Sequence, residues 1–326
     1  MAAERVEPHS LVPEAVQRRM IFLCGSVRAG TTMTRLMLSE HSQIDERGEQ
    51  PFLFDGVTAH DIETGGTEAR RQAFRDGIAA SRVARLHSIA PPALASVPEM
   101  IAAMVQDQLD TDAPYTLITW HRNYHLAALM FPSARWIHLA RDPRDVAVSV
   151  TKMGWTGNPY FGVDVWRQHA RDWAAAEPLI GTPVIRARFE EVTADPRGEM
   201  GRLLGQIGLG FEEGVLSPPG QSTYAAPDKK RAKAWESALT AREAGEIDWR
   251  RRDVPDEGYA GSPVAAGFAR RVRLAAGNKA GRMRHGAARY GAPLFFGEMA
   301  ARRLKLNAAH APLRLRMQEI QNRHLK

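Results

Sequence analysis

Apolar residues along the chain follow two different periods. Residues 20–24 form a continuous apolar run that stops at Gly25, a pattern typical of a strand buried on both faces. Later runs rich in β-branched and aromatic residues also predict strands. These runs are 115–120, 135–140 and 183–188.

Helical spacing fills the segments between the predicted strands. Pro98 suits the first turn of one of these helices, because proline is well tolerated there. Strands that alternate with helices predict an α/β fold, a P-loop-like parallel sheet with helices on both faces. The predicted helices are 31–39, 68–86, 97–109, 121–131, 143–153, 162–178 and 196–208.

The two ends of the chain depart from this alternation. The start is polar, and prolines and glycines gather between residues 250 and 267, as in a linker. Beyond them the chain is rich in Arg, Ala, Gly and Leu, which predicts a basic helical extension. The predicted organisation is a lead-in over 1–18, a main domain over 19–250, a linker over 251–263 and a mainly helical tail over 264–326.

Charge separates the tail from the rest of the protein. The 326 residues carry a net charge of +7, yet residues 261–326 hold 14 Lys and Arg against two acidic residues. The remainder holds 30 basic and 35 acidic residues and is net negative. No basic motif with interleaved aromatic residues is present, so we do not expect nucleic acid as a partner.

Composition also points to a cellular compartment. The single cysteine, Cys24, excludes an intrachain disulfide and fits a reducing compartment. No apolar run approaches the roughly 18 residues of a membrane span, and the start lacks the apolar segment of a secretory signal. We expect a cytoplasmic protein, with a peripheral position at the inner face of the membrane as the alternative that the tail allows.

The strongest local motif joins the first strand to the first helix. Residues 25–32, Gly-Ser-Val-Arg-Ala-Gly-Thr-Thr, have the Gly-x-x-x-x-Gly frame of a phosphate loop, where backbone N–H groups approach phosphate oxygens. Nucleoside triphosphatases place a Lys where this chain has Thr31. Arg28 is the basic residue here, and the strand 135–140 ends at Arg141 rather than at a Mg²⁺-binding Asp. The loop therefore suits a phosphate without catalytic magnesium, unless it is a glycine turn without a ligand.

A second motif follows the strand 135–140. Arg141-Asp142-Pro143-Arg144-Asp145 opens a helix, and Ser149 lies about two turns into it. Arg141 and Ser149 could converge on one phosphate, because a guanidinium fork matches phosphate geometry. A capped helix start with surface ion pairs is the alternative.

Together these motifs resemble the PAPS-dependent sulfotransferase family, where PAPS is 3′-phosphoadenosine-5′-phosphosulfate. Residues 27–32 are similar to its 5′-phosphosulfate loop and residues 131–149 to its 3′-phosphate motif. A third similar stretch spans 188–209, and the resemblance covers roughly residues 20 to 250. It is closer to the tyrosylprotein and carbohydrate branch than to the cytosolic small-molecule branch.

The resemblance implies transfer of a sulfuryl group from PAPS to an acceptor hydroxyl by in-line displacement. It implies no metal and no covalent intermediate, and the product would be adenosine 3′,5′-bisphosphate. The acceptor we expect is a glycan, a glycolipid or another lipid-linked alcohol, bound by loops within 50–95 and 210–230. The implied cofactor-binding residues are Arg28, Ala29, Gly30, Thr31, Thr32, Arg141, Ser149, Phe189 and Lys233. Lys230 is an alternative to Lys233, and a solvated helix face is the alternative to both. Arg28 is also implied to be catalytic, through its contact with the 5′-phosphosulfate.

An acceptor alcohol needs a base to take its proton. By the resemblance Glu49 is the best match, and Glu46 is the fallback because the loop after the first helix is one residue off the expected spacing. A solvated loop glutamate without a catalytic role is the alternative to Glu49 as the base. His121 is the competing base; His121 or Arg122 could instead stabilise the leaving oxygen as preorganised positive charge. His121 and His125 lie one helical turn apart, but without a third ligand in the sequence a metal is the weaker interpretation.

Two other functions remain open. One is a small-molecule kinase that uses the phosphate loop, against which the missing loop Lys argues. The other is a non-catalytic module that docks on membranes or glycans through the tail. Residues 295–306 mix large apolar and basic residues at helical spacing, so they could contact an anionic membrane, the protein's own main domain or a second copy.

Overall fold

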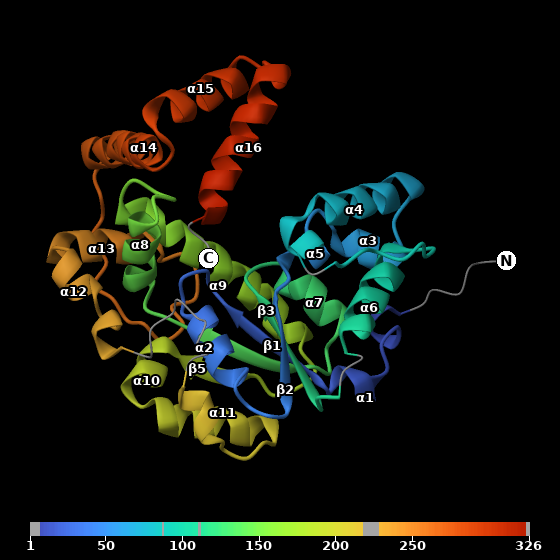
Figure 1. Cartoon of the computed structure of the whole chain (residues 1–326). Coiled ribbons are helices and arrows are strands. Elements are labelled where there is room, and N and C mark those ends of the chain that lie inside the picture. The colour runs from blue at the N-terminus through green and yellow to red at the C-terminus, as the bar shows by residue number, and fades with distance from the viewer. Residues whose placement is uncertain (1–6, 87, 110–111, 218–227, 324–326) are drawn as a thin grey trace. The chain divides into compact units, whose positions relative to one another are not determined.

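The computed structural model describes residues 7–86, 88–109, 112–217 and 228–323 (Figure 1). The chain divides into two compact units. The first unit comprises 1–142, 166–234 and 254–258, and the second comprises 143–165, 235–253 and 259–326. Each unit is described by itself below, and the domain boundaries expected from the sequence stay predictions.

The first unit is built on a five-stranded sheet in which all pairs are parallel. The strand order is β2-β3-β1-β4-β5, so the apolar β1 lies in the middle and β2 forms an edge. The predicted α/β fold with a parallel sheet is confirmed. The strands are β1 Met20–Gly25, β2 Ile44–Glu49, β3 Tyr115–Trp120, β4 Arg135–Ala140 and β5 Ile185–Arg188.

Helices cover both faces of this sheet, because successive side chains of the central strands point to opposite sides. Phe22 of β1 packs in one apolar cluster and Leu23 in another. Figure 1 shows the two helical layers on either side of the strands. One layer contains α2 Thr31–Leu38, α10 Phe189–Ala194 and α11 Pro196–Ile207; the other contains α3 Ala59–Thr64, α4 Glu68–Ala80, α6 Val97–Gln108, α7 Tyr124–Met130 and the later part of α9 Pro159–Ala176.

Three local expectations from the sequence were wrong. The segment around 44–49, read as a loop, is the edge strand β2. The helix expected over 68–86 breaks at Ser81 into α4 and α5 Arg82–Leu86. The helix expected from residue 121 begins at Tyr124, because Asn123 adopts the left-handed conformation with φ 59°.

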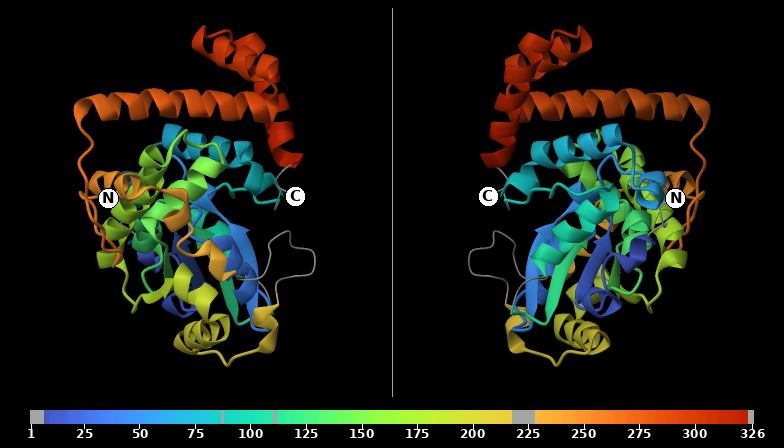
Figure 2. Two further views of the ribbon diagram at one scale, coloured as in Figure 1. Left: turned by 90° about the vertical axis from the view of Figure 1, so that its left-hand side faces the viewer. Right: turned by 90° about the vertical axis from the view of Figure 1, so that its right-hand side faces the viewer.

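The second unit is helical, and its last three helices confirm the predicted helical extension. A buried carboxylate, Glu246, forms ion pairs with Arg242 and Arg270 and so ties α13 to α14. Figure 2 shows α14 as a long helix followed by α15 and α16. No helix among the described residues has both the length and the apolar character to cross a membrane. The elements are α8 Pro143–Lys152, the start of α9, α12 Trp235–Ala238, α13 Ala241–Arg250, α14 Phe268–Tyr290, α15 Ala292–Arg303 and α16 Asn307–Arg323.

Candidate functional site

The phosphate loop connects β1 to α2 through two residues with positive φ. Arg28 has φ 72° and Gly30, the N-cap of α2, has φ 99°. The first helical hydrogen bond runs from the N–H of Thr34 to the carbonyl of Gly30, so the N–H groups of Thr31 and Thr32 precede the helical ladder. These N–H groups and the positive end of the helix dipole form an anion-binding position.

Ala29 shapes this loop from inside. Its side chain is buried, and its N–H donates to the carbonyl of Ser26 at 2.9 Å. Both observations place Ala29 inside the turn, and its contact with the cofactor stays a prediction. Its role in the loop is to close the turn that presents Arg28 and Gly30.

Arg141 and Phe189 lock the loop from the side. The Phe189 ring lies so close to Gly30 that a Cβ atom at this position would collide with it. The guanidinium of Arg141 stacks over the same ring, 4.0 Å from its centroid, and Nη1 donates to the carbonyl of Arg28 at 2.8 Å. Phe189 is buried and supports the loop, and its contact with the nucleotide stays a prediction.

A basic segment also reaches Arg141. The Nη2 of Arg141 donates to the carbonyl of Arg231 at 2.8 Å, and Lys233 follows two residues later with an exposed side chain. The structure therefore brings the segment of Lys233 beside the phosphate loop, while the side chain of Lys230 lies outside what it describes. Ser149 lies on α8 in the second unit, so its partnership with Arg141 stays a prediction.

A β-bulge orients the predicted base. Residues Glu46 and Glu49 of β2 pair with Leu117 and Thr119 of β3, so three residues of one strand span two of the other. Gly48, with φ 76°, allows this extra residue. Because the bulge restores the alternation of side chains, both glutamates face the same side of the sheet.

The two glutamates have different partners. Glu46 accepts from Arg35 Nη1 at 2.5 Å and also from the N–H of Gly48. Glu49 Oε1 lies 3.4 Å from His121 Nε2, and its carboxylate also interacts with the Thr32 side chain of the phosphate loop. The structure thus brings together Glu49, His121 and Thr32, whereas Glu46 belongs to an ion pair with α2.

His121 is held in turn by the start of the loop. Its Nδ1 lies 2.9 Å from the carbonyl of Gly25, and its side chain is buried. A carbonyl only accepts, so Nδ1 carries a proton, and Nε2 donates to Glu49 only when the ring is an imidazolium. His121 and Glu49 therefore form one proton-sharing pair beside the phosphate loop.

Charge and hydrogen bonding determine the protonation of Glu49. The hydrogen bond with His121 lowers the pKa of Glu49 below its ordinary value, and the positive charges of His121 and Arg35 add to this effect against the opposing effect of burial. Glu49 is consequently a carboxylate at neutral pH and can accept a proton.

Two residues beside this pair have partners of their own. Arg122 forms an exposed ion pair with Asp55 at 2.6 Å, and its role at a leaving oxygen stays a prediction. Tyr124 was missed by sequence reasoning, yet its hydroxyl donates to the carbonyl of Gly25 at 3.0 Å. A buried aromatic residue on an apolar helix face carries no sequence signal of such a role.

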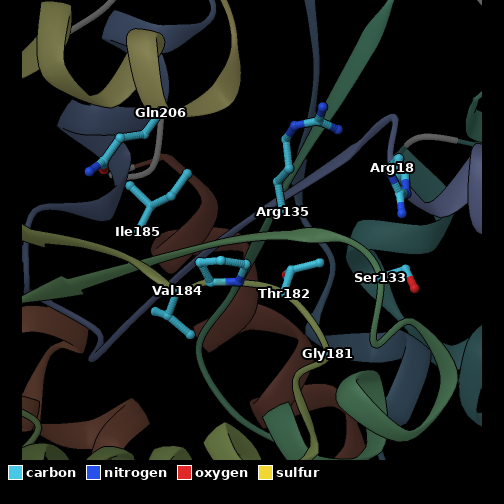
Figure 3. A pocket seen from close by; sticks show the side chains of 9 residues that line it. Arg18, Ser133, Arg135, Gly181, Thr182, Val184, Ile185 and Gln206 are labelled. Atoms are coloured by element: carbon cyan, nitrogen blue, oxygen red, sulfur yellow. The ribbon is translucent and has the colours of Figure 1, made fainter.

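A separate cavity of about 500 Å³ lies at the amino-terminal ends of the strands (Figure 3). Arg135 and Ile185, which begin β4 and β5, belong to its lining. Ligands of open α/β sheets bind at the carboxyl ends of the strands, where the phosphate loop is. This cavity is therefore not the candidate active site.

Comparisons with known proteins agree with the motifs. Residues 20–213 match the sequence model described as the sulfotransferase family. A relative from Aquifex aeolicus (strain VF5), an uncharacterized protein, is 27% identical over an alignment of 227 residues; the match covers 63% of this chain and 28% of the relative. The chain thus spans little more than a quarter of that relative's length.

Solved structures with similar chains are remote in sequence. The sulfotransferase domain from the Synechococcus PCC 7002 olefin synthase is 18% identical, with a TM-score of 0.49 over 72% of this chain and 93% of that chain. The sulfotransferase domain from the curacin biosynthetic pathway is 16% identical, with a TM-score of 0.48 over 72% and 96%. Retinol dehydratase in complex with androsterone and the inactive cofactor PAP is 12% identical, with a TM-score of 0.41 over 81% and 86%.

Proposed function

Because this chain belongs to the sulfotransferase family, we propose that it transfers the sulfuryl group of PAPS to an acceptor hydroxyl, with Glu49 as general base. The observation that carries the proposal is the position of Glu49. Its carboxylate interacts with Thr32 of the phosphate loop and with His121, which is bound to the loop's first carbonyl. A base is thereby held next to the anion-binding end of α2.

The loop and its neighbours fit the anionic groups of PAPS. PAPS supplies an activated sulfuryl group on a 5′-phosphate, and its 3′-phosphate adds negative charge. The N–H groups of Thr31 and Thr32 with Arg28 would hold the 5′ end, since they combine a helix N-terminus with a cation. Arg141 and Ser149 would hold the 3′-phosphate, and Lys233 would add positive charge near the cofactor.

Glu49 is the better base of the two glutamates. Arg35 and the N–H of Gly48 occupy the carboxylate of Glu46, so a proton on Glu46 would break an ion pair. Glu49 is ionised at neutral pH and would take the acceptor proton, which it can share with His121. Such proton transfer contributes typically about 10²–10⁴-fold to a rate.

The acceptor we propose is an alcohol on a glycan, a glycolipid or another lipid-linked molecule, and we propose that the tail brings the protein to an anionic membrane surface. The tail supports this with its excess of 14 basic over two acidic residues in 261–326. It also exposes large apolar side chains beside basic ones, among them Phe268, Leu304 and Leu306. Basic and apolar groups together favour binding to anionic lipid headgroups.

Binding measurements test the donor. Adenosine 3′,5′-bisphosphate and PAPS should bind in calorimetry without added metal, and radiolabelled sulfate should move from PAPS to lipid or glycan alcohols. Binding of Mg²⁺-ATP without binding of the bisphosphate would overturn the proposal in favour of a kinase. Binding of neither would leave the non-catalytic docking module.

A further inference from the structure

Three titratable side chains outside the phosphate loop meet in the interior of the first unit. They are His138 on β4, His169 on α9 and Glu257 in the segment 254–258. Their side chains are only 3%, 2% and 8% exposed. None of them has a part in the sulfuryl transfer proposed above, so their burial needs another explanation.

The spacing of their ligand atoms is that of a tetrahedral metal site. Nε2 of His138 lies 3.0 Å from Nε2 of His169, and Oε1 of Glu257 lies 3.5 Å and 3.6 Å from these two atoms. Zinc–ligand bonds of 2.0–2.2 Å in tetrahedral geometry put neighbouring ligand atoms roughly 3.3–3.6 Å apart. An ion at bonding distance from all three therefore fits with small side-chain shifts.

The carboxylate of Glu257 is buried beside these two imidazoles without a hydrogen bond of good geometry. Within the described part of the chain, neither of its oxygens has a hydrogen-bond donor in good geometry. A buried carboxylate without donors is costly unless it is paired or bound to a metal. Its backbone is also in the left-handed region, with φ 51°, which non-glycine residues adopt rarely and mostly at functional positions.

The two histidines are already fixed as ligands require. His169 Nδ1 lies 2.8 Å from the hydroxyl of Tyr124, which donates to the carbonyl of Gly25. Nδ1 of His169 therefore carries the proton, and Nε2 is left as an acceptor. The ring of His138 stacks on Trp173 at a centroid distance of 4.1 Å and an angle of 2°, which fixes its plane.

The site has one open side. His138 and Glu257 line a cavity of about 280 Å³, together with Arg188. Arg188 Nη2 donates to the main-chain carbonyl of Glu257 at 3.2 Å and so holds this segment against β5. A water molecule in the cavity would supply the fourth ligand, as in zinc sites with three protein ligands.

We propose that His138, His169 and Glu257 bind a zinc ion that fastens the segment 254–258 to β4 and α9. Two imidazoles and one carboxylate form a ligand set that zinc accepts readily. Binding needs the Nε2 lone pair of His138, so the His138 proton moves from Nε2 to Nδ1 when the metal enters. Through Tyr124 the same ion would steady the carbonyl of Gly25, at the start of the phosphate loop.

Direct metal binding tests the proposal independently of any sulfuryl transfer. The full chain, stripped with a chelator, should take up one Zn²⁺ per molecule in competition with a chromogenic chelator. Co²⁺ in its place should show the intense visible absorption of four-coordinate cobalt. Glu257→Gln and His138→Asn should each weaken Zn²⁺ binding more than the roughly 10–100-fold typical of losing an outer-shell partner, and Tyr124→Phe should fall within that range.

The matched control is His60→Asn, which removes an exposed histidine of α3 and should leave the affinity unchanged. Zinc binding that is absent in the wild type, or equal in Glu257→Gln, would refute the site. Anomalous diffraction at the zinc edge from wild-type crystals does not depend on the folding of variants. A peak bonded to the three named atoms supports the proposal, and a peak elsewhere or no peak contradicts it.

Discussion

His121 Nε2 lies 3.4 Å from Glu49 Oε1, while the other ring nitrogen of His121 is bound to the first carbonyl of the phosphate loop. Strand β2 ends at Glu49, and His121 directly follows β3, the neighbour of β2 in the sheet. The parallel pairing therefore places a carboxylate and an imidazole side by side at the carboxyl ends of the strands, where the phosphate loop begins. The pair links the protonation of the base to the loop itself.

This link makes the acidic limb of the pH profile depend on His121. In the wild type the limb of kcat/KM should lie below the ordinary Glu range of ~4.3, because His121 first, and then nearby positive charge, lowers the pKa of Glu49. His121→Asn keeps a donor for Gly25 but removes the positive partner, while burial continues to raise the pKa. The limb should then move to higher pH.

The control for this shift is His125→Asn, since His125 is not among the groups that lower the pKa of Glu49. The same pair bears on stability: its contribution is present above the unfolded-state pKa of Glu49 and is lost as the pH falls through the folded-state pKa. The wild type should therefore have a larger free energy of unfolding than His121→Asn above the unfolded-state pKa of Glu49, and this difference should disappear as the pH falls through the folded-state pKa. An unchanged profile in His121→Asn would contradict the pairing.

Glu49→Gln should abolish most of the transfer while it keeps the cofactor site. We expect a fall in kcat of about 10²–10⁴-fold, with affinity for adenosine 3′,5′-bisphosphate unchanged, because an amide cannot take the proton. Radiolabelled transfer assays and calorimetry measure the two quantities. Glu46→Gln is the matched comparison: it should lower thermal stability, because it removes the ion pair with Arg35, while transfer continues. A loss of transfer in Glu46→Gln and not in Glu49→Gln would identify Glu46 as the base.

Much of the sheet could be predicted because its central strands are rich in apolar, β-branched and aromatic residues. β1, β3 and β4 are largely buried on both faces, and this composition is typical of such strands. β2 could not be predicted in this way, since Ile44-Asp-Glu-Arg-Gly-Glu is almost entirely polar. Most of its side chains are partly exposed, so polar residues are tolerated there and the apolar pattern of a strand is lost.

The site was predictable in its local motifs and not in its long-range contacts. The phosphate loop and Arg141 follow predicted strands directly, so order along the chain placed them. The contact of Phe189 with Gly30 depends on how β5 ends, and the β-bulge between Glu46 and Glu49 lies in the segment whose spacing was one residue off the expected one. His138, His169 and Glu257 come from distant segments that only the folded chain brings together.

Arg141→Lys should weaken binding of adenosine 3′,5′-bisphosphate by roughly ten- to hundredfold, the equivalent of one hydrogen bond to a charged group. Lysine keeps the charge but loses the planar fork and the stacking over Phe189. Calorimetry gives the affinity. Arg122→Lys is the control, because Arg122 pairs with Asp55 at an exposed position. An equal loss of affinity in Arg122→Lys would contradict a role of Arg141 in cofactor binding.

The tail predicts binding to anionic vesicles. Arg303→Glu with Lys305→Glu should reduce sedimentation with vesicles of phosphatidylglycerol and phosphatidylcholine by more than roughly tenfold, since each basic residue near the surface contributes ~1 kcal/mol. Both side chains are exposed. Arg82→Glu with Arg85→Glu makes the same change of net charge on α5 and should have little effect. If both double variants lost vesicle binding equally, or if the wild type did not bind anionic vesicles, the proposed membrane association would be wrong.

Gly30→Ala tests whether the phosphate loop depends on its left-handed N-cap. The φ of 99° is unfavourable for a residue with Cβ by about 1–2 kcal/mol, and the new methyl group would also collide with the Phe189 ring. We expect the free energy of unfolding in urea to fall by at least that amount and bisphosphate binding to weaken with it. Gly205→Ala is the opposite control: it lies in α11 with open space around its Cβ position and should stabilise the protein by about 0.4–1 kcal/mol. If Gly30→Ala kept both stability and binding, the loop would not need the conformation on which the anion site is argued.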